Sequence, residues 1–334
     1  MTQGLNTGNF IKGLFQSHTP TEFNGLSIEL FHYQLNENHV YAEYISYLGI
    51  DTAKIHKPEQ IPFLPIGFFK THTIKSGMFQ EEIIFKSSGT GGMQRSKHFV
   101  RSMDLYRKSF YSAFMHFYGD PANYRFLGLL PSYLEREGSS LIFMAKALAG
   151  SGAYAESGFY LDEFGLLANQ LLSISQKQYP AIILGVSFAL LDFAEKYPVA
   201  LGKNVIVMET GGMKGRREEL PREDLHGRLC EAFKIEAIHS EYGMTELLTQ
   251  AYSKGWGRFK TPPWMKVFIR DIQDPFTILP QGQTGAINII DLANVHSCAF
   301  IETQDIGRLH PDGTFEVLGR TDSSDIRGCS LLLA

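Results

Sequence analysis

The residues best suited to chemistry form a loop of hydroxyl groups and glycines, after a short apolar run that ends at Phe85. The loop contains Ser87, Ser88, Gly89, Thr90, Gly91 and Gly92, and two cations, Arg95 and Lys97, follow it. Glycines leave backbone N–H groups uncovered and hydroxyl groups donate hydrogen bonds, so a loop of this composition can bind anions. Lys97 adds a mobile positive charge. The stretch therefore predicts a polyphosphate-binding loop.

Two familiar phosphate-binding motifs do not describe this loop. Counted from Gly91, the Walker A pattern meets Ser96 at its second glycine and His98 at its Ser/Thr position. The dinucleotide-binding pattern starts with Gly89 and Gly91 but meets Gln94 where its third glycine belongs. An ordinary flexible surface loop is the alternative. The preceding strand and the following cations disfavour it.

A second stretch, Ser240–Glu246, combines an aromatic ring, a glycine, a hydroxyl and a carboxylate. Tyr242 offers a flat face for an adenine, and Gly243 permits a tight turn. Glu246 offers an oxygen ligand for a magnesium ion bound to phosphate. The alternative is a helix N-terminus, in which Thr245 and Glu246 cap a helix over the leucines that follow. Both interpretations remain open at this point.

Two further motifs near the C-terminus carry opposite charges. Asp305 is expected at a strand end, where a carboxylate can accept hydrogen bonds from both hydroxyls of a ribose. Arg320 has a planar fork of donors that can bridge ribose and phosphate oxygens. The alternative for the Asp305-Ile306-Gly307 sequence is an ordinary turn.

The elements around these motifs alternate between apolar strands and helices. Strands are expected at 126–130, 181–186, 204–208 and 235–238, and helices within 26–48 and at 104–118, 139–149, 188–197 and 218–233. Strands that are apolar throughout predict an α/β fold with a parallel sheet covered by helices on both faces. The loops at 210–212 and 239–246 follow strands, so they are expected near one another at the ligand-binding edge.

The sequence pattern changes after residue 263, where short expected strands separated by turn residues begin. Strands are expected at 267–269, 286–291, 299–302 and 314–318. The sequence thus predicts an α/β core over residues 1–263 and a small β-rich subdomain with a short C-terminal arm over residues 264–334.

Composition limits the classes of function. Lys and Arg total 31 against 35 Asp and Glu, a net charge of −4, so a broad basic field for nucleic acid is not expected. Three cysteines without a C-x-x-C pair disfavour a disulfide framework or a zinc site and favour a reducing compartment. The start of the chain lacks a signal-peptide pattern, and the longest apolar run, 181–191, is too short to span a membrane. We therefore expect a cytoplasmic protein without a membrane span.

Together, these motifs resemble those of the adenylate-forming enzymes, which include acyl-CoA synthetases, adenylation domains and luciferases. Their order is S-S-G-T-G-G with a later K, then T-G-G, Y-G-M-T-E, D-I-G and G-R-x-D. Within this superfamily the sequence is most similar to the LuxE-type acyl-protein synthetases, through Leu130–Glu135, Thr210–Lys214 and Ile326–Leu331. The resemblance extends from the region of Pro62 to the end of the chain.

The resemblance implies a role for each motif. Phosphate binding is implied for Ser87, Ser88, Gly89, Thr90, Gly91, Gly92 and Lys97, adenine binding for Gly211, Gly212, Tyr242 and Gly243, and ribose or phosphate contacts for Asp305 and Arg320. Thr245 is implied to touch the α-phosphate, Glu246 to hold magnesium, and Tyr133 to lie near the acyl pocket. ATP and Mg²⁺ are therefore the expected cofactors.

The implied reaction is the activation of a carboxylic acid, expected to be a fatty acid, as an acyl-adenylate, with acyl transfer to a protein cysteine. The alternatives are a phenylacetate-type acyl- or aryl-CoA ligase and a non-catalytic nucleotide- or acyl-binding module. Most of the superfamily continues beyond G-R-x-D into a mobile C-terminal domain with a catalytic lysine, whereas Ser323–Ala334 alone follow it here. We therefore expect that domain to be absent, which disfavours the CoA ligase.

Cys329 is the expected acyl acceptor, because a thiolate can take an acyl group from an adenylate and hold it as a thioester. The LuxE-type enzymes have their acceptor cysteine near the C-terminus and exchange the acyl chain with a reductase. An acyl-CoA or aldehyde reductase, or an acyl carrier, is thus an expected partner. The alternative is an ordinary buried cysteine packed under Leu331–Leu333. Cys230 and Cys298 are less suited, because one lies on an expected helix and the other beside an expected strand.

Overall fold

The computed structural model describes residues 5–88, 94–131, 138–161, 163–211, 217 and 220–321. The chain divides into two compact units. The first unit comprises Met1–Ile84, Gly89–Ser102 and Lys260–Ala334, and the second comprises Phe85–Ser88 and Met103–Phe259. The predicted domain division at residue 263 stays a prediction.

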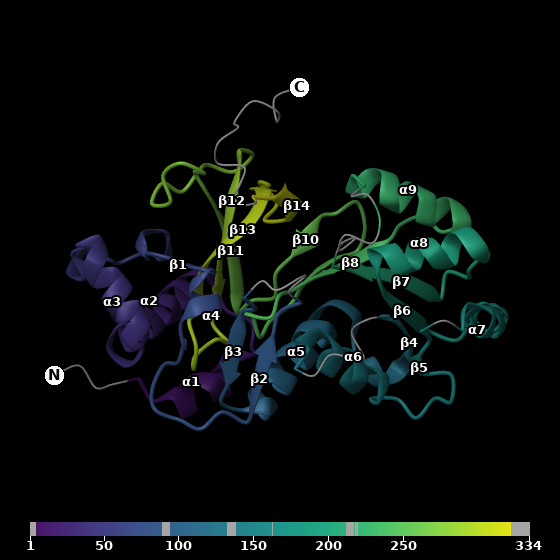
Figure 1. Cartoon of the computed structure of the whole chain (residues 1–334), viewed down its shortest axis with the longest axis horizontal. Coiled ribbons are helices and arrows are strands. Elements are labelled where there is room, and N and C mark those ends of the chain that lie inside the picture. Colours follow the sequence, from purple (N-terminus) through teal and green to yellow (C-terminus); the bar gives the residue numbers. More distant parts are fainter. Residues whose placement is uncertain are drawn as a thin grey trace. The chain divides into compact units, whose positions relative to one another are not determined.

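The described helices and strands follow one another along both units (Figure 1). The α-helices are α1 (Thr7–Leu14), α2 (Pro20–Glu37), α3 (His39–Leu48), α4 (Phe68–Thr71), α5 (Met103–Tyr118), α6 (Ser140–Ala149), α7 (Phe164–Gln176), α8 (Ser187–Lys196) and α9 (Arg222–Phe233). Short 3₁₀ helices cover Thr52–Lys54, Pro58–Gln60 and Pro121–Asn123. The strands are β1 (Leu64–Pro65), β2 (Ile83–Lys86), β3 (Lys97–Val100), β4 (Arg125–Leu129), β5 (Gly158–Phe159), β6 (Ala181–Val186), β7 (Val205–Thr210), β8 (His239–Tyr242), β9 (Ala251–Ser253), β10 (Phe259–Lys260), β11 (Met265–Arg270), β12 (Thr284–Asp291), β13 (Phe300–Leu309) and β14 (Phe315–Arg320).

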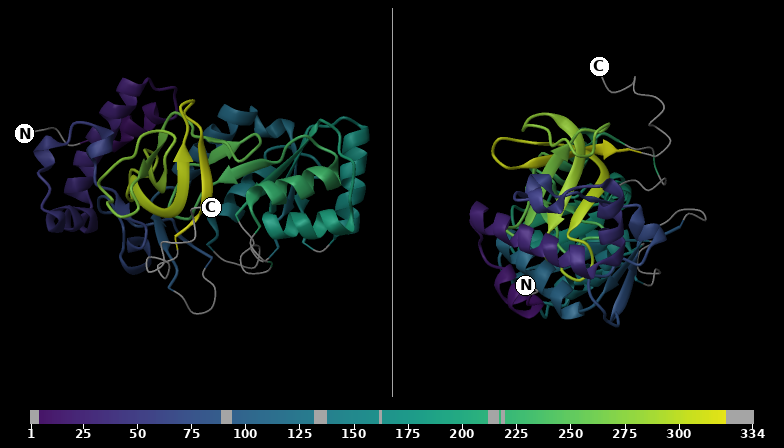
Figure 2. Two further views of the ribbon diagram at one scale, coloured as in Figure 1. Left: turned by 90° about the horizontal axis from the view of Figure 1, so that it is seen from above. Right: turned by 90° about the vertical axis from the view of Figure 1, so that its left-hand side faces the viewer.

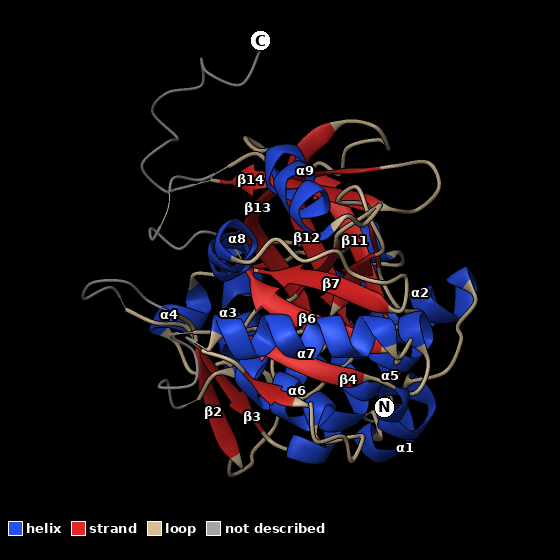
Figure 3. Cartoon of the chain, turned by 90° about the vertical axis from the view of Figure 1, so that its right-hand side faces the viewer, coloured by secondary structure: helices blue, strands red, loops and turns tan. Residues whose placement is uncertain are grey.

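The second unit is built on the predicted parallel sheet. Its strands lie in the order β5-β4-β6-β7-β8-β9, and all neighbours are parallel except β8 and β9. Every residue of β4 and β6 is buried, as expected for strands covered on both faces. Helix α8 lies on one side of β6 and β7, and α6 lies on the other side of the sheet (Figure 3). The predicted α/β architecture is confirmed for this unit.

Some predicted elements were wrong or missing in the sequence analysis. A strand was predicted at 235–238, but β8 begins at His239. The reason is that α9 ends with Lys234 in the left-handed conformation (φ 54°), and the next four residues form the connection to the strand. Helices α1 and α7 are not among the elements expected from the sequence.

In the first unit, strands β11 to β14 form an antiparallel sheet in sequence order, and β1 pairs in parallel with β13. Helices α2 and α3 lie beside these strands, purple against yellow-green in Figure 2. The contact is polar as well as apolar. The Gln34 amide donates to the Asn294 carbonyl (2.8 Å) and accepts from the Ala299 N–H (2.9 Å), and Asn38 donates to the Ser297 carbonyl (2.9 Å). These bonds fix α2 and its C-terminal cap against the connection between β12 and β13.

Two local features define the start of α2. Thr19 accepts a hydrogen bond from the Glu22 N–H, and the Glu22 carboxylate accepts one from the Thr19 N–H, which makes a capping box. Pro20 occupies the first helical position, where a missing N–H costs nothing. In the part of the chain that the structure describes, no helix is both long and apolar enough to cross a membrane.

Candidate active site

The carboxyl ends of β7 and β8 bring two of the predicted motifs together. Strand β7 ends at Thr210 and is followed by Gly211, and β8 ends at Tyr242 and is followed by Gly243. The two strands are parallel, with Thr210 beside Glu241 in the register. Both glycines are exposed. The expectation that these two stretches are neighbours is therefore confirmed.

Tyr242 packs against Phe259 within the second unit. Its ring centroid lies 5.8 Å from that of Phe259, with 60° between the ring planes. The Arg222 guanidinium lies over the Phe259 ring, 5.2 Å from its centroid. Tyr242 is only 9% exposed.

A buried polar network centred on Glu209 supports the end of β7. Its carboxylate accepts hydrogen bonds from Arg222 on α9 and from the Ser187 hydroxyl on α8 (3.1 Å). The same hydroxyl lies 3.1 Å from the Gly211 carbonyl oxygen. Burial favours the neutral carboxyl, but the nearby His226 ring and the charge of Arg222 outweigh it and hold the pKa of Glu209 below its ordinary value. The network therefore connects the Gly211 turn to two helices.

Glu241 forms a second buried contact on the opposite face of the strands, because successive strand residues point to opposite sides. The Thr210 hydroxyl donates to Glu241 Oε2 at 2.5 Å. Burial, together with the negative charge of Glu209, raises the pKa of Glu241 to about 7, although the Thr210 hydrogen bond opposes the rise. Glu209 and Glu241 are not among the site residues expected from the sequence. A carboxylate in the largely apolar strand β7 is a signal for Glu209. Glu241 lies in the polar strand β8 and has no such signal.

The segment after β8 is a turn and not a helix. Thr245 and Glu246 lie in this turn, which the Leu247 N–H closes by donating to the Met244 carbonyl (3.1 Å). The helix-cap alternative for these two residues is therefore wrong. Thr245 is half-buried and Glu246 is buried, and both lie a few residues beyond Tyr242.

The predicted phosphate loop begins directly after β2. Ser87 is half-buried and Ser88 is exposed. The N–H of Lys86 donates to the Gly138 carbonyl (2.8 Å), which ties the start of the loop to the chain that follows β4. Lys97 is exposed at the start of β3, in the first unit. The predicted residues that lie outside the described part of the chain are Gly89, Thr90, Gly91, Gly92, Tyr133, Gly212 and Cys329.

Asp305 and Arg320 are cross-strand neighbours in the first unit. The register of β13 and β14 pairs them directly, and Arg320 Nε lies 3.9 Å from Asp305 Oδ1. Arg320 also donates to Gln304 Oε1 (3.4 Å). Asp305 was predicted at a strand end or in a turn, but it lies inside β13, beside a register shift between Ile306 and Gly307. The strand continues past Asp305 because β14 pairs with it there.

Comparison with known proteins identifies the family. The sequence model described as acyl-protein synthetase, LuxE, matches residues 156–334, which is more than half of the chain. This chain belongs to the LuxE acyl-protein synthetase family. The match includes β7, β8, β13 and β14, and thus the strand ends with Gly211 and Tyr242 and the Asp305–Arg320 pair.

One curated relative of this LuxE family member is the long-chain-fatty-acid–luciferin-component ligase of Vibrio harveyi. It is 30% identical over 145 residues, which are 40% of this chain and 38% of the relative. The match thus spans about two fifths of the relative's length.

Solved structures of adenylate-forming ligases share the fold. A 2-hydroxyisobutyryl-CoA ligase in complex with an acyl-AMP and CoA has a TM-score of 0.64 at 12% identity, over 91% of this chain and 70% of that one. ATP-bound MatB from Rhodopseudomonas palustris has a TM-score of 0.55 at 16% identity, over 73% of this chain and 49% of that one. The predicted adenylate-forming fold is therefore confirmed.

The turn after β8 offers one carboxylate that could hold a magnesium ion. Mg²⁺ is usually held by one or two carboxylates together with substrate phosphates. Glu246 is a buried carboxylate (5% exposed) in the turn after β8. Within the described ranges, no three His, Cys, Asp or Glu side chains are grouped so that they could hold a metal ion. A cation here would therefore depend on phosphate oxygens for most of its ligands.

Two of the three cysteines of this LuxE family member are poor nucleophiles in the folded chain. Cys298 is fully buried, its thiol donates to the Phe300 carbonyl (3.4 Å), and burial raises its pKa to about 12. Cys230 lies half-buried on α9, where burial also raises its pKa. Because the thiolate is the reactive form, neither is suited to accept an acyl group at neutral pH.

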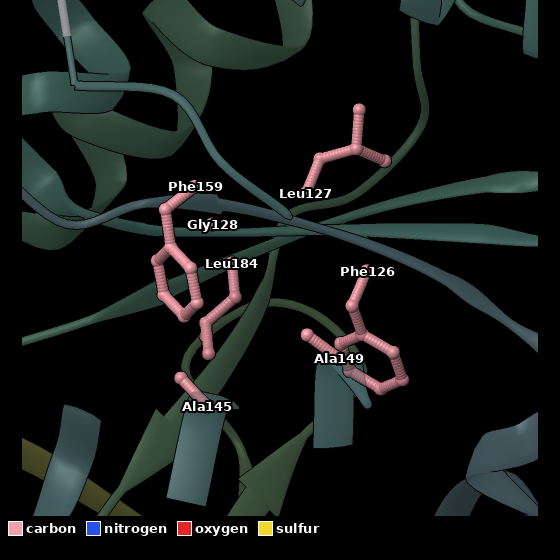
Figure 4. Close-up of a pocket in the computed structure, with 7 residues that line it drawn as sticks. All are labelled: Phe126, Leu127, Gly128, Ala145, Ala149, Phe159 and Leu184. Carbon is pink, nitrogen blue, oxygen red and sulfur yellow. The ribbon is translucent and has the colours of Figure 1, made fainter. Parts of the chain in front are cut away.

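A small apolar pocket lies beside β4 in the second unit (Figure 4). Its lining consists of Phe126, Leu127, Gly128, Ala145, Ala149, Phe159 and Leu184. A Cβ atom at position 128 would lie 2.6 Å from the Phe159 ring, so a glycine is required there for close packing. The cavity volume is about 10 Å³, which is about the room that a single water molecule needs. The pocket is therefore too small to enclose a long fatty acid by itself.

Proposed function

We propose that this LuxE family member activates a carboxylic acid with ATP and transfers the acyl group to a protein thiol. In the first step, a carboxylate oxygen attacks the α-phosphorus of ATP, the bond from that phosphorus to the bridging oxygen breaks, and pyrophosphate leaves. In the second step, a cysteine thiolate attacks the acyl carbon of the adenylate, and AMP leaves. The observation that carries the proposal is the family match over residues 156–334.

The proposed acid is a long-chain fatty acid. The support is the name of the Vibrio harveyi relative, a ligase of long-chain fatty acid and a luciferin component. The same name supports a protein partner for the acyl group. We infer that an acyl carrier or a reductase receives the acyl chain, as the sequence predicts.

The proposed roles of the residues are those that the sequence motifs imply. Gly211, Tyr242 and Gly243 at the ends of β7 and β8 would bind the adenine together with Gly212, and Thr245 would donate to the α-phosphate. The loop of Ser87, Ser88, Gly89, Thr90, Gly91 and Gly92, with Lys97, would bind the outer phosphates. Asp305 would accept hydrogen bonds from the ribose hydroxyls and Arg320 would donate to ribose or phosphate oxygens.

The main work of these groups would be positioning and charge neutralisation. A carboxylate that attacks a polyphosphate is an anion that approaches an anion, so the barrier falls when preorganised donors surround the phosphates. Lys97 and the loop N–H groups would supply those donors. A magnesium ion held by Glu246 would, when bound, neutralise additional phosphate charge.

A CoA ligase is the second candidate function. The observation that favours it is the fold similarity to the 2-hydroxyisobutyryl-CoA ligase, which covers 91% of this chain. The two candidates differ in the second step alone, because CoA would replace the protein cysteine as the thiol.

The test is to incubate the protein with ATP, Mg²⁺ and a labelled long-chain fatty acid, with and without CoA. The proposal predicts AMP formation and protein-bound label that hydroxylamine releases, with little acyl-CoA. Cys329→Ser should abolish this label, and Cys230→Ser, the matched control, should retain it. Rapid accumulation of acyl-CoA would favour the second candidate. A protein that binds ATP but forms neither product would be a binding module.

A further inference from the structure

Glu241 and Thr210 form a tie between the ends of β7 and β8. They are register partners, both are buried, and the Thr210 hydroxyl donates to Glu241 Oε2 at 2.5 Å. This hydrogen bond runs across the sheet at the last residue of β7, immediately before Gly211. A hydrogen bond at this point restrains the direction in which both chains leave the sheet.

The second carboxyl oxygen of Glu241 lies against Gly243. The two residues are two positions apart, so they face the same side of the strand. A Cβ atom at position 243 would lie 2.5 Å from Glu241 Oε1 and 3.3 Å from Gln250 Cγ. Gly243 does not have a positive φ. A side chain at position 243 would therefore meet the Glu241 carboxyl, which would have to move away, whereas the backbone conformation itself does not demand a glycine.

We propose that Glu241 is a positioning residue for nucleotide binding, because its carboxyl holds Thr210 on one side and covers the Gly243 backbone on the other. In this way it fixes the separation between Gly211 and Tyr242. The inference rests on the proposed function, since these two residues are the proposed adenine contacts. Glu241 itself need not touch the nucleotide.

Two observations support this positioning role of Glu241. The raised pKa of Glu241 keeps a large fraction of the carboxyl neutral near pH 7, so the tie does not place a second full charge beside Glu209. The Ser187 hydroxyl lies 3.1 Å from the Gly211 carbonyl oxygen and acts from the opposite face. The Gly211 turn is thus held from both sides of the sheet.

The test combines a double-mutant cycle with a measurement of backbone opening. The variants are Glu241→Ala, Gly243→Ala, the double variant, and Glu241→Gln. Exposed Glu236, in the connection between α9 and β8, supplies the control Glu236→Ala. We expect Glu241→Ala and Gly243→Ala each to raise KM for ATP by roughly tenfold or more, with a smaller change in kcat. Glu241→Gln, which keeps the side-chain oxygen, should stay within about threefold of the wild type.

The cycle decides whether the two residues act together. In the Glu241→Ala background, Gly243→Ala should add little, because the carboxyl that its Cβ would meet is gone. Equal effects of Gly243→Ala in both backgrounds, or an unchanged KM in Glu241→Ala, would overturn the proposal.

Hydrogen exchange in the nucleotide-free protein separates this inference from the proposed function. Glu241→Ala should speed amide exchange at residues 208–211 and 240–246, and Glu236→Ala should not. Suppose that Glu241→Ala speeds amide exchange but the wild-type protein neither binds ATP nor exchanges pyrophosphate. The Glu241–Thr210 contact would then be supported as a structural feature, but its role in nucleotide binding and the proposed function would both be refuted. Unchanged exchange in an active protein would refute this inference alone.

Discussion

Arg222 donates a hydrogen bond to the buried carboxylate of Glu209, and this pair joins α9 to the carboxyl end of β7. The Glu209 side chain is 3% exposed, whereas that of Arg222 is 30% exposed. A charge this deeply buried is tolerated because partners compensate for the water that it has lost. The pair therefore connects the stability of the unit to the strand end that carries Gly211.

Replacement of Arg222 should destabilise the protein. Arg222→Met keeps most of the side-chain volume but leaves the Glu209 carboxylate without its main cation, at a cost of about 3 kcal/mol, the lower end of the range for a broken buried pair. The measurement is the free energy of unfolding in urea. Arg217→Met is the control, because Arg217 pairs with the more exposed Asp192 and Glu195 and should cost about 1 kcal/mol or less. Equal losses of unfolding free energy in the two variants would show that the Arg222–Glu209 pair stabilises the protein no more than the Arg217 pairs do.

Glu241 should make stability depend on pH. Its pKa is raised from the ordinary value of 4.5 to about 7 in the fold, mainly by burial, with Glu209, Tyr106 and Tyr252 as neighbouring groups. Between these two values the folded state binds more protons than the unfolded state, so stability falls as pH rises. The full loss, up to about 3 kcal/mol, is present above the folded pKa.

Glu241→Gln removes this loss, because the amide is neutral at every pH. The variant should gain stability relative to the wild type in urea unfolding at about pH 8, and little or none at about pH 4. A difference between the two proteins that is the same at both pH values would mean that Glu241 titrates as it does in the unfolded chain.

Lys97→Ala should weaken ATP use without affecting folding, since Lys97 is exposed. A charge-assisted hydrogen bond is worth about 1.5–3 kcal/mol, so kcat/KM for ATP should fall by roughly 10- to 150-fold. Arg95→Ala is the matched control, because Arg95 is an exposed cation two residues away, and it should change kcat/KM much less. Wild-type pyrophosphate exchange in Lys97→Ala would remove this residue from the site.

Glu246→Gln should raise the magnesium concentration that half-saturates adenylate formation. The amide preserves the shape of the side chain but lacks the anionic oxygen that a hard cation prefers. The measurement is a magnesium titration of pyrophosphate exchange, together with thermal unfolding, with exposed Glu236→Gln as the control. Thermal unfolding at a much lower temperature with an unaltered magnesium requirement would assign Glu246 a structural role.

The sequence predicted well those elements whose apolar pattern is continuous. The strand at Ala181–Val186 was predicted with its exact bounds because all six residues are apolar or glycine and all are buried. The expected strand at 235–238 is misplaced, because Lys234 caps α9 in the left-handed conformation and four further residues precede β8. The position of Asp305 inside β13 depends on its pairing with Arg320 of the next strand, β14, and its own residue type does not indicate this pairing.

The sequence alone indicates the motif residues but not the side chains that contact and support them. Gly211 and Tyr242 stand out by residue type and by their place after apolar runs, although the strand that ends at Tyr242 begins later than expected. The contacts of Glu209 with Ser187 and Arg222 join three separate elements. They exist because α8 and α9 pack against the same face of the sheet, and no local pattern specifies which polar group each carboxylate meets.

Acid-dependent exchange of labelled pyrophosphate into ATP tests the central claim most directly. The wild-type protein is incubated with ATP, Mg²⁺, labelled pyrophosphate and a panel of carboxylic acids of increasing chain length. We expect exchange that requires the acid and is fastest with a long-chain fatty acid. A protein that binds ATP but shows no exchange with any acid of the panel would contradict it.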